Sequence, residues 1–386
     1  MDKMSFFLIL LVLICYVPMK MCLLKSENLY MMNFSDFSMC FFILVLLIAF
    51  LTNSILIFYI FFENCLFYLM FLVLVTGYQP ERITANFYLF NYTLISSFPF
   101  LIVLIYFSLT EINFWVNYTF FIFSISSFFM LCCWLMIFVK IPIYIFHLWL
   151  PKVHVEASTV GSMLLAAVIL KLGGYLLFRL LSCSMIFFNT YSWLFSLGLF
   201  SFFLASVSSV FQSDLKSLIA YSSILHMSLS LIVSFSSNYS YFLLLILFFS
   251  HGLSSNILFL SAGYIFYSGG SRLIFYSKNY HSYSFLFFLI LMLTFLFNLG
   301  VPLSFNFLFE IMGIFIVFFY FSFSIFFIFL SMMFSLMLFL VVFNGLLMSK
   351  KKLMVSFFYN DFFLFNFSSL LFLMISILMY FFFLSF

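Results

Sequence analysis

The chain has 386 residues, of which 67% are hydrophobic and only 6% are charged, and its formal net charge is +4. Because about a quarter of the residues of a water-soluble domain are charged, this composition excludes a soluble globular protein. A surface that faces lipid tails needs no charge, so the sequence predicts an integral membrane protein.

A helix that crosses the bilayer needs roughly 20 apolar residues. Twelve hydrophobic runs are predicted to be membrane spans, and they lie near 4–24, 37–51, 54–76, 88–109, 119–150, 159–181, 190–211, 215–235, 240–267, 284–318, 322–347 and 364–386. The first run follows Lys3, but residues 16–20 lack a small-residue cleavage site. We therefore interpret it as a retained helix and not as a signal peptide.

Alternate numbering of the runs assigns every loop to one of two sides of the membrane. One of them, called side B, holds ten of the fourteen Lys and Arg residues, whereas the loops of the other side hold only Lys3 and Arg179. The ten are Lys20, Lys25, Arg82, Lys152, Lys216, Arg272, Lys278, Lys350, Lys351 and Lys352. Side B is therefore expected to face the cytoplasm or the mitochondrial matrix.

Four charged residues fall inside predicted spans: Glu63, Lys140, Lys171 and Glu310. A charge near the bilayer centre costs at least ~2.5 kcal/mol, so such residues usually have a function. Burial disfavours the charged form of an ionisable side chain and a nearby opposite charge favours it, so moving the partner moves a proton. These residues predict a proton relay; the alternative is static ion pairs that hold helices together.

The histidines extend this set. His226 and His251 lie in or at the edge of spans, where they are either proton carriers or hydrogen-bonding core residues. His147 and His154 flank the loop after the first overlong run, where capping or proton uptake is possible, and we favour a structural role. His281 lies in a loop, where we expect it to be solvated.

Two runs are too long for one ordinary span. Residues 119–150 would form a helix about 48 Å long, and Pro142 is the predicted break, two residues after Lys140. The run 284–318 is interrupted by residues 298–302, eight residues before Glu310. Interrupted helices at corresponding positions of two halves are typical of inverted-repeat transporters.

These features predict an all-α polytopic membrane protein of about 12 transmembrane helices, with two inverted five-helix repeats that each contain a broken helix. The predicted organisation is a single membrane domain over 1–386, with a first repeat at 37–181, a second at 190–347 and a C-terminal helix at 364–386. Walker loops, dinucleotide fingerprints and CxxC pairs are absent from the sequence, so no cofactor or metal is expected on this chain.

Seven segments match one known family in the same order: FYIFFENCL (58–66), GYQPERITA (77–85), VKIPIYIFHLWLPKVHVEAS (139–158), GSMLLAAVILKLGGYLLFRL (161–180), SDLKSLIAYSSILHM (213–227), HGLSSNILF (251–259) and NLGVPLSFNFLFE (298–310). On these segments the chain resembles the subunit 4 family of mitochondrial NADH dehydrogenase, respiratory complex I. The resemblance implies an antiporter-like subunit of the mitochondrial inner membrane that translocates protons coupled to electron transfer from NADH to ubiquinone.

The resemblance also implies partners and cofactors. The partners are other complex I subunits, especially neighbouring antiporter-like membrane subunits, and the lipid bilayer, with no nucleic acid. NADH, FMN, iron–sulfur clusters and ubiquinone belong to other subunits, so this chain takes part in the NADH:ubiquinone reductase without redox chemistry of its own.

Roles for the buried residues follow from the same resemblance. Glu63 matches the carboxylate that pairs with the pumping lysine, which Lys140 matches, and Lys171 matches the central connecting lysine. The two span histidines match the second half-channel, and Glu310 matches the terminal carboxylate. The predicted proton-transfer residues are therefore Glu63, Lys140, Lys171, His226, His251 and Glu310.

The chain departs from the family's pattern in a few places. It has one predicted helix before the second span where the family has three, and Tyr68, Ser158 and Leu303 replace family prolines. Two other classes of function stay open on the residues alone: a secondary cation/proton antiporter, and a structural scaffold without pumping. Co-purification with redox subunits distinguishes the first, and proton flux after removal of the buried charges distinguishes the second.

Overall fold

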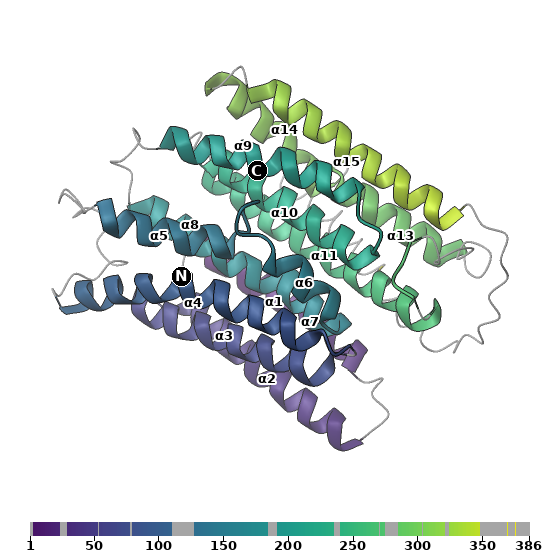
Figure 1. Cartoon of the computed structure of the whole chain (residues 1–386), viewed down its shortest axis with the longest axis horizontal. Helices are drawn as coiled ribbons and strands as arrows, with labels where there is room; N and C mark the ends of the chain where they lie inside the picture. The colour runs from purple at the N-terminus through teal and green to yellow at the C-terminus, as the bar shows by residue number, and fades with distance from the viewer. Residues whose placement is uncertain are drawn as a thin grey trace.

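A computed structural model of the chain describes residues 3–23, 29–52, 54–77, 79–109, 127–183, 191–234, 240–269, 271–274, 285–302, 304–320 and 324–347, with Ser369 and Ile375. Regular structure in these ranges is helical, apart from an isolated β-bridge between Asp214 and Leu273. The helices lie side by side in one bundle (Figure 1). The predicted all-α membrane fold is confirmed.

The first half of the chain contains α1 (Lys3–Leu23), α2 (Leu29–Leu51), α3 (Ile55–Thr76), α4 (Arg82–Leu109), α5 (Ser127–Lys140), α6 (Trp149–Glu156), α7 (Thr159–Leu164), the π turn η1 (Leu165–Ile169) and α8 (Leu170–Cys183). The second half contains α9 (Tyr191–Val210), α10 (Leu215–Ser234), α11 (Ser240–Gly269), α13 (Phe285–Asn298), α14 (Phe305–Tyr320) and α15 (Ser324–Leu347).

Eight helices of the described chain are long and apolar enough to cross a membrane, and four shorter apolar helices accompany them. Both overlong runs break where the prolines predict. Two helices begin earlier than predicted. The helix α2 begins at Leu29 and not at residue 37, and α4 begins at Arg82 and not at residue 88. The predicted C-terminal helix, 364–386, lies outside the described residues except for two positions.

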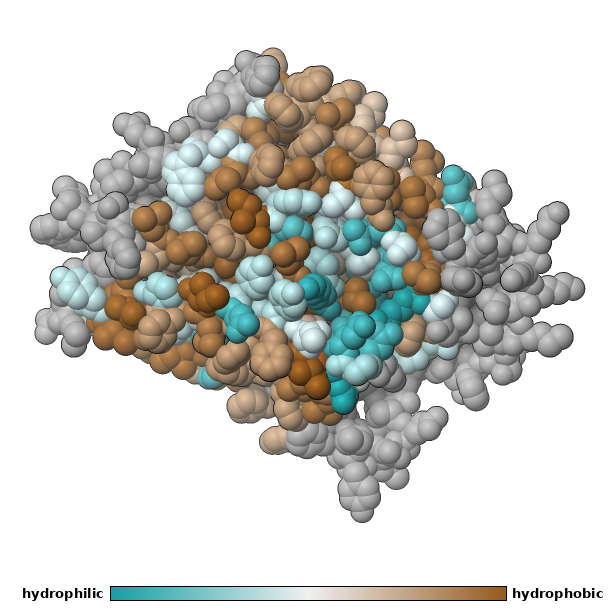
Figure 2. Space-filling view, viewed as in Figure 1, coloured by the Kyte–Doolittle hydropathy of each residue, from teal (hydrophilic) through white to brown (hydrophobic). Residues whose placement is uncertain are grey.

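The bundle has an enclosed centre and an apolar outer wall. The membrane-crossing parts of α7–α8 and of α11 are 100% buried, whereas that of α15 is 22% buried. On the face in Figure 2, hydrophilic residues gather around α6 and α7, and apolar residues cover the flanks. Apolar side chains on the outer helices meet lipid tails without cost, so the centre is where polar groups must find partners.

One prediction about the loops was wrong. Lys216, assigned to a loop of side B, is buried in the first turn of α10, and its Nζ donates to the carbonyl of Ala157 at 2.6 Å. Beside it, Arg272 pairs with Glu156 at 3.6 Å between Nη1 and Oε1. These contacts tie α10 and the segment 271–274 to the end of α6, so the basic charge serves packing as well as topology.

Close helix packing depends on Gly174 of α8. A Cβ at this position would lie 2.2 Å from Cζ of Phe248 on α11, with two more ring atoms within 2.8 Å. Phe248 is fully buried and cannot move aside. The contact lets the two central helices approach one another, in the way small residues do in membranes.

We expect Gly174→Ala to destabilise the bundle by about 2 kcal/mol, because overpacking a buried contact forces neighbouring groups apart. The measurement is the thermal unfolding temperature in detergent. Gly161→Ala is the matched control, since its Cβ would meet Ala157 at 3.3 Å, a contact that a small shift relieves. Equal unfolding temperatures of the two variants would contradict the assigned contact.

Candidate functional site

The first helix break ends α5 at Lys140. Pro142 has no backbone N–H and disfavours helical geometry in the residue before it, so the helix stops and resumes at Trp149. The indole N–H of Trp149 donates to the carbonyl of Val139 at 3.1 Å. That contact satisfies a carbonyl group in the last turn of α5, which has no partner in its own helix.

Lys140 lies buried at this break and meets Glu63, which α3 carries in its middle. The Nζ of Lys140 is 3.5 Å from Oε1 of Glu63. On the other side, α8 brings Gly173 against Lys140: a Cβ at Gly173 would lie 3.0 Å from the Cβ of Lys140. A larger residue at 173 would push α5 away from α8, so the glycine fixes where the lysine side chain starts.

Lys171 is the second buried lysine among the predicted site residues, and a π turn precedes it. The turn η1 departs from regular α-helical hydrogen bonding, and the Nζ of Lys171 donates to the carbonyl of Ala166 within it. The same Nζ lies 2.7 Å from Nδ1 of His251 on α11. Lys171 is fully buried, so these two contacts replace its hydration.

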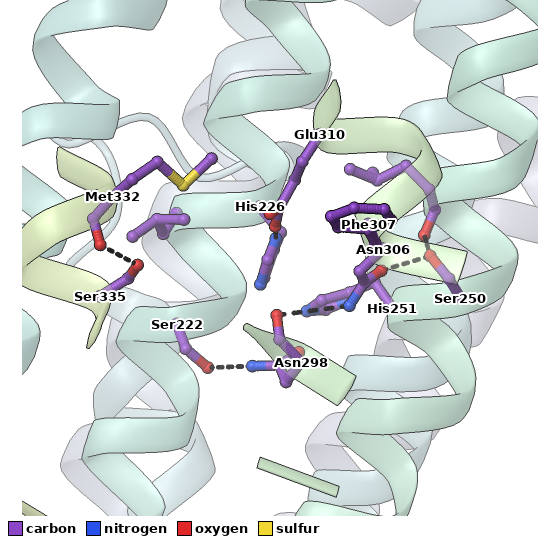
Figure 3. Close-up of polar contacts among 12 residues, drawn as sticks. Ser222, His226, Ser250, His251, Asn298, Asn306, Phe307, Glu310, Met332 and Ser335 are labelled. Atoms are coloured by element: carbon purple, nitrogen blue, oxygen red, sulfur yellow. Dashed lines mark hydrogen bonds and ion pairs between the residues drawn. The ribbon is translucent and has the colours of Figure 1, made fainter. Parts of the chain in front are cut away.

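The contacts continue from His251 into the second half of the chain. The rings of His251 and His226 have centroids 5.3 Å apart with an interplanar angle of 53°. Nδ1 of His226 lies 3.9 Å from Oε1 of Glu310 on α14. Figure 3 shows the His226 and Glu310 side chains pointing toward one another. Four helices thus contribute to one row of buried ionisable groups.

The second break separates α13 from α14 and exposes backbone carbonyl groups inside the bundle. Asn306, in the first turn of α14, donates from Nδ2 to the carbonyl of Phe297 at 3.1 Å and to that of Asn298 at 3.4 Å. Its Oδ1 accepts a hydrogen bond from Ser250 of α11. One amide side chain therefore supplies a donor to two carbonyl groups at the end of α13.

Asn298, the last residue of α13, is held by both central helices of the second half. Its Oδ1 accepts from Ser254 of α11 at 3.1 Å. Its Nδ2 donates to Ser222 of α10 at 3.3 Å, as Figure 3 shows. The side-chain amides of Asn298 and Asn306 thus both have hydrogen-bond partners on neighbouring segments. This fixes the start of α14, and with it the position of Glu310.

Gly300 lies at the centre of the second break with a φ of 71°. This left-handed conformation is readily adopted by glycine alone. A Cβ here would also lie 2.2 Å from Oε2 of Glu310. The glycine therefore serves twice, since it allows the turn and leaves space for the carboxylate.

The six predicted site residues fall into two groups. Glu63 and Lys140 form a pair at the first break, and the other four form the row that ends at the second break. The groups approach one another along α8, which carries Lys171 two residues before the glycine that packs on Lys140. The structure gives the positions of these residues, and their roles stay predictions.

His147 and His154 make no ion pair or hydrogen bond with the row in the described part of the chain, although His154 is close enough to Lys171 and His251 to interact electrostatically with them. His147 is buried, forms a hydrogen bond to the carbonyl of Tyr144 and stacks on that ring at 4.4 Å. His154 is fully buried, and its ring lies parallel to that of Phe259 at 4.4 Å. His281 lies outside the described residues.

Two of the three residues that replace family prolines have local partners. Tyr68 stacks on Phe42 of α2 and donates to Ser38 at 3.1 Å, while α3 stays a continuous helix. Ser158 caps α7 by accepting from the N–H of Gly161 at 3.3 Å. Leu303 lies outside the described residues.

Sequence reasoning missed the residues that close the breaks. Asn306 precedes Glu310 by four residues, so the two share a helix face, and this spacing was a usable signal. An asparagine inside an apolar run is a second one, since its amide needs partners in the membrane. The indole donor of Trp149 and the π turn left no such signal.

Comparison with known proteins gives matches in sequence and in structure. The family described as NADH:quinone oxidoreductase/Mrp antiporter, TM matches residues 52–338. "NADH-ubiquinone oxidoreductase chain 4" of Locusta migratoria is 41% identical over 228 residues, which are 57% of this chain and 50% of that protein. The protein of the same name from Caenorhabditis elegans is 35% identical over 257 residues, 66% of this chain and 61% of that protein. The match thus spans about half the length of the first relative.

Two solved structures share the fold. A chain of respiratory complex I from Thermus thermophilus with bound NADH superposes with a TM-score of 0.85 at 21% identity, covering 98% of this chain and 81% of that one. A chain of the Mrp complex from Dietzia sp. DQ12-45-1b superposes with a TM-score of 0.77 at 16% identity, covering 91% and 67%. At these identities the likeness concerns the arrangement of helices.

We expect Gly300→Ala to disrupt the second break, because the left-handed conformation costs a side chain about 1–2 kcal/mol and the new methyl group displaces the Glu310 carboxylate. The measurement is thermal unfolding together with the level of assembled protein in the membrane. Gly161→Ala, at a helical position of α7 where the new Cβ would lie 3.3 Å from the Cβ of Ala157, is the control and should be tolerated. If the two substitutions have equal effects, the break does not depend on Gly300.

Proposed function

The chain belongs to the NADH:quinone oxidoreductase/Mrp antiporter family of membrane proteins, and on that premise we propose that it is a proton-translocating subunit of NADH:ubiquinone oxidoreductase. The identity of 41% to a relative named as chain 4 of that enzyme supports the assignment. In this role the chain moves protons across the membrane while electrons pass from NADH to ubiquinone in other subunits.

The chain is a multi-pass protein of the mitochondrial inner membrane. In the proposed complex, its neighbours are other antiporter-like membrane subunits, which would cover part of the apolar outer wall, and lipid covers the rest. NADH, FMN, iron–sulfur clusters and ubiquinone are held by other subunits. This chain contributes proton transfer alone.

The observation that carries the proposal is the row of buried ionisable side chains. From Lys171 to Glu310 the row crosses α8, α11, α10 and α14, with the contacts of 2.7, 5.3 and 3.9 Å described above. Holding four ionisable groups in an apolar bundle costs free energy, so residues of this kind usually have a function. A merely structural arrangement would need only pairs.

The pair of Lys140 and Glu63 at the first break supplies a proton-release step that a conformational change can control. An ammonium in an apolar surrounding is stabilised by its carboxylate partner, and it releases its proton more readily when that partner is neutralised or turns away. A change in the distance between Lys140 and Glu63 therefore moves a proton. The non-helical residues 141–148 allow such a change, because the lysine ends its helix there.

The row in the second half can carry the released proton further. Each histidine accepts a proton at one ring nitrogen and releases one from the other, so the two rings together form a relay. The separation of 3.9 Å between His226 and Glu310 exceeds a hydrogen bond. Transfer across it requires a side-chain rotation or a bridging water molecule.

We also propose that 37–181 and 190–347 are inverted repeats. The two breaks support this division. A donor in the second part of each broken helix reaches a carbonyl in the first part: Trp149 reaches Val139, and Asn306 reaches Phe297. Each break also adjoins a glycine in contact with a site residue. The repeats thus place the breaks at corresponding positions, as in other transporters of this kind.

A cation/proton antiporter is the second candidate, and the likeness to a chain of the Mrp complex favours it on fold alone. The two functions differ in what drives proton movement. Proton flux that follows a sodium or potassium gradient in vesicles without NADH supports exchange. Flux that requires NADH oxidation supports the respiratory role.

We expect Lys140→Met in the assembled complex to abolish most proton translocation through this subunit and to slow ubiquinone reduction, because the two steps are coupled. The measurements are the proton-to-electron ratio in sealed vesicles and the rate of NADH oxidation. Unchanged values of both would contradict the role of Lys140.

Lys152→Met is the matched control for this experiment. Lys152 lies on the other side of the same break, is exposed, and places its Nζ over the ring of Tyr88 at 3.4 Å. It lies outside both groups of the site. Its replacement should leave the proton-to-electron ratio unchanged.

A further inference from the structure

Lys140 and Lys171, the two buried lysines of the site, differ in what surrounds their ammonium groups. Lys171 has a carbonyl and a histidine nitrogen within hydrogen-bond distance. Lys140 has the Glu63 carboxylate at 3.5 Å, longer than an ordinary charge-assisted hydrogen bond of about 2.8 Å, and no closer acceptor within the described part of the chain. An ammonium so poorly provided with acceptors needs another source of stabilisation.

That source is the aromatic ring of Phe62, the residue next to Glu63. The Nζ of Lys140 lies 4.4 Å from the centroid of this ring, within the range of a cation–π interaction. Phe62 is fully buried and Lys140 is 3% exposed. Little water screens the contact, and a desolvated cation–π interaction is stronger than an exposed one.

The ring is fixed in place from a second helix. Phe62 stacks on Phe58, one turn earlier on α3, with centroids 5.9 Å apart and planes at 16°. Phe58 meets Tyr175 of α8 at 5.5 Å. The hydroxyl of Tyr175 accepts from Arg179 at 2.7 Å. This ladder runs from the lysine site toward the end of α8, and it prevents the ring from turning away.

We infer that Phe62 is a positioning residue for Lys140, whose ring holds the charged ammonium when Glu63 is neutral or displaced. This inference rests on the proposed proton-transfer role of Lys140. Gly173 of α8 fixes the backbone of Lys140, and Tyr175 of α8 fixes the aromatic ladder. The ring of Phe62 and the ammonium of Lys140 therefore keep their separation while the carboxylate of Glu63 moves.

Other charged groups do not supply this effect. Glu63 is the partner that the described ion pairs give to Lys140. Among the described side chains, the ionisable ones on the helices packed against α5 are Arg82, Tyr88, Tyr92 and Tyr106 on α4, and Lys171, Tyr175 and Arg179 on α8, while α3 carries Tyr59, Cys65 and Tyr68 besides Glu63. A positive charge among them would destabilise the ammonium form of Lys140, whereas the ring of Phe62 stabilises it.

The test compares Phe62→Leu with Phe62→Tyr in the assembled complex. The measurement is the rate of NADH-driven proton translocation across neutral and alkaline pH. We expect Phe62→Leu to move the alkaline limb to lower pH by about one unit, since loss of a desolvated cation–π contact is of that order. Phe62→Tyr keeps the ring and should leave the limb in place.

The variant Phe202→Leu on α9 is the control for the loss of packing in Phe62→Leu. Phe202 is 1% exposed, against 0% for Phe62, and the described cation–π contacts do not include it. Its replacement creates a similar cavity and should leave the alkaline limb unchanged. A shift of the limb in this control as large as in Phe62→Leu would overturn the inference.

A second measurement does not depend on pumping. Thermal unfolding is compared for the unchanged chain, Phe62→Leu, Lys140→Met and the double variant, which isolates the interaction between the two side chains. We expect Phe62→Leu to lower the unfolding temperature less when residue 140 is methionine. If Phe62→Tyr does not assemble, this comparison still tests whether the ring of Phe62 stabilises Lys140.

The outcomes separate the inference from the proposed function. An unmoved alkaline limb in Phe62→Leu, with an equal loss of stability in both backgrounds, overturns the role of the ring and leaves the role of Lys140 intact. Normal pumping by Lys140→Met contradicts the proposed function, while the stability comparison still tests whether the ring stabilises the ammonium.

Discussion

An unpaired charge or backbone polar group inside the hydrocarbon core costs several kcal/mol, and this cost determines where the chain places its polar residues. The helices that other helices enclose, α7–α8, α10 and α11, carry Lys171, His226 and His251. Outer helices such as α15 face outward with apolar side chains that need no partner. The bundle is therefore a set of apolar outer helices around a centre that holds the polar groups.

The same cost explains how the two breaks persist in the membrane. A broken helix leaves carbonyl groups without donors, and in each case a single side chain from the following segment supplies one: an indole N–H from Trp149 and an amide from Asn306. The asparagine is itself held by Ser250, so the second break is linked to α11. Where the backbone is freed from its helix, a charged residue can change its position at lower cost. Each break thus combines a carbonyl group that a side chain satisfies with a nearby site residue.

The spans and the breaks could be predicted from sequence because both depend on local properties: the length of an apolar run and the backbone geometry of Pro142 and Pro302. The contacts between helices could not. A quarter of the residues are aromatic and the runs are apolar all round, so no stripe of polar residues indicates which face of a helix is turned inward. For the same reason Lys216 was assigned to a loop from its position near a run's end, although its partner, the carbonyl of Ala157, lies 59 residues away. The order of the helices and the positions of the charges could be predicted from the sequence, whereas the rotation of each helix about its axis could not.

The π turn over Leu165–Ile169 sets the rotation of everything that follows it on α8. Successive residues of a helix are rotated by about 100°, so removal of one residue here would turn the rest of the helix by that amount. Lys171, Gly173 and Tyr175 meet α11, α5 and α3 respectively, and all three contacts depend on one register. The packing consequently depends more strictly on the length of this segment than on which apolar residues compose it. One apolar residue can replace another within it, whereas loss of a single codon would turn three contacts out of alignment together.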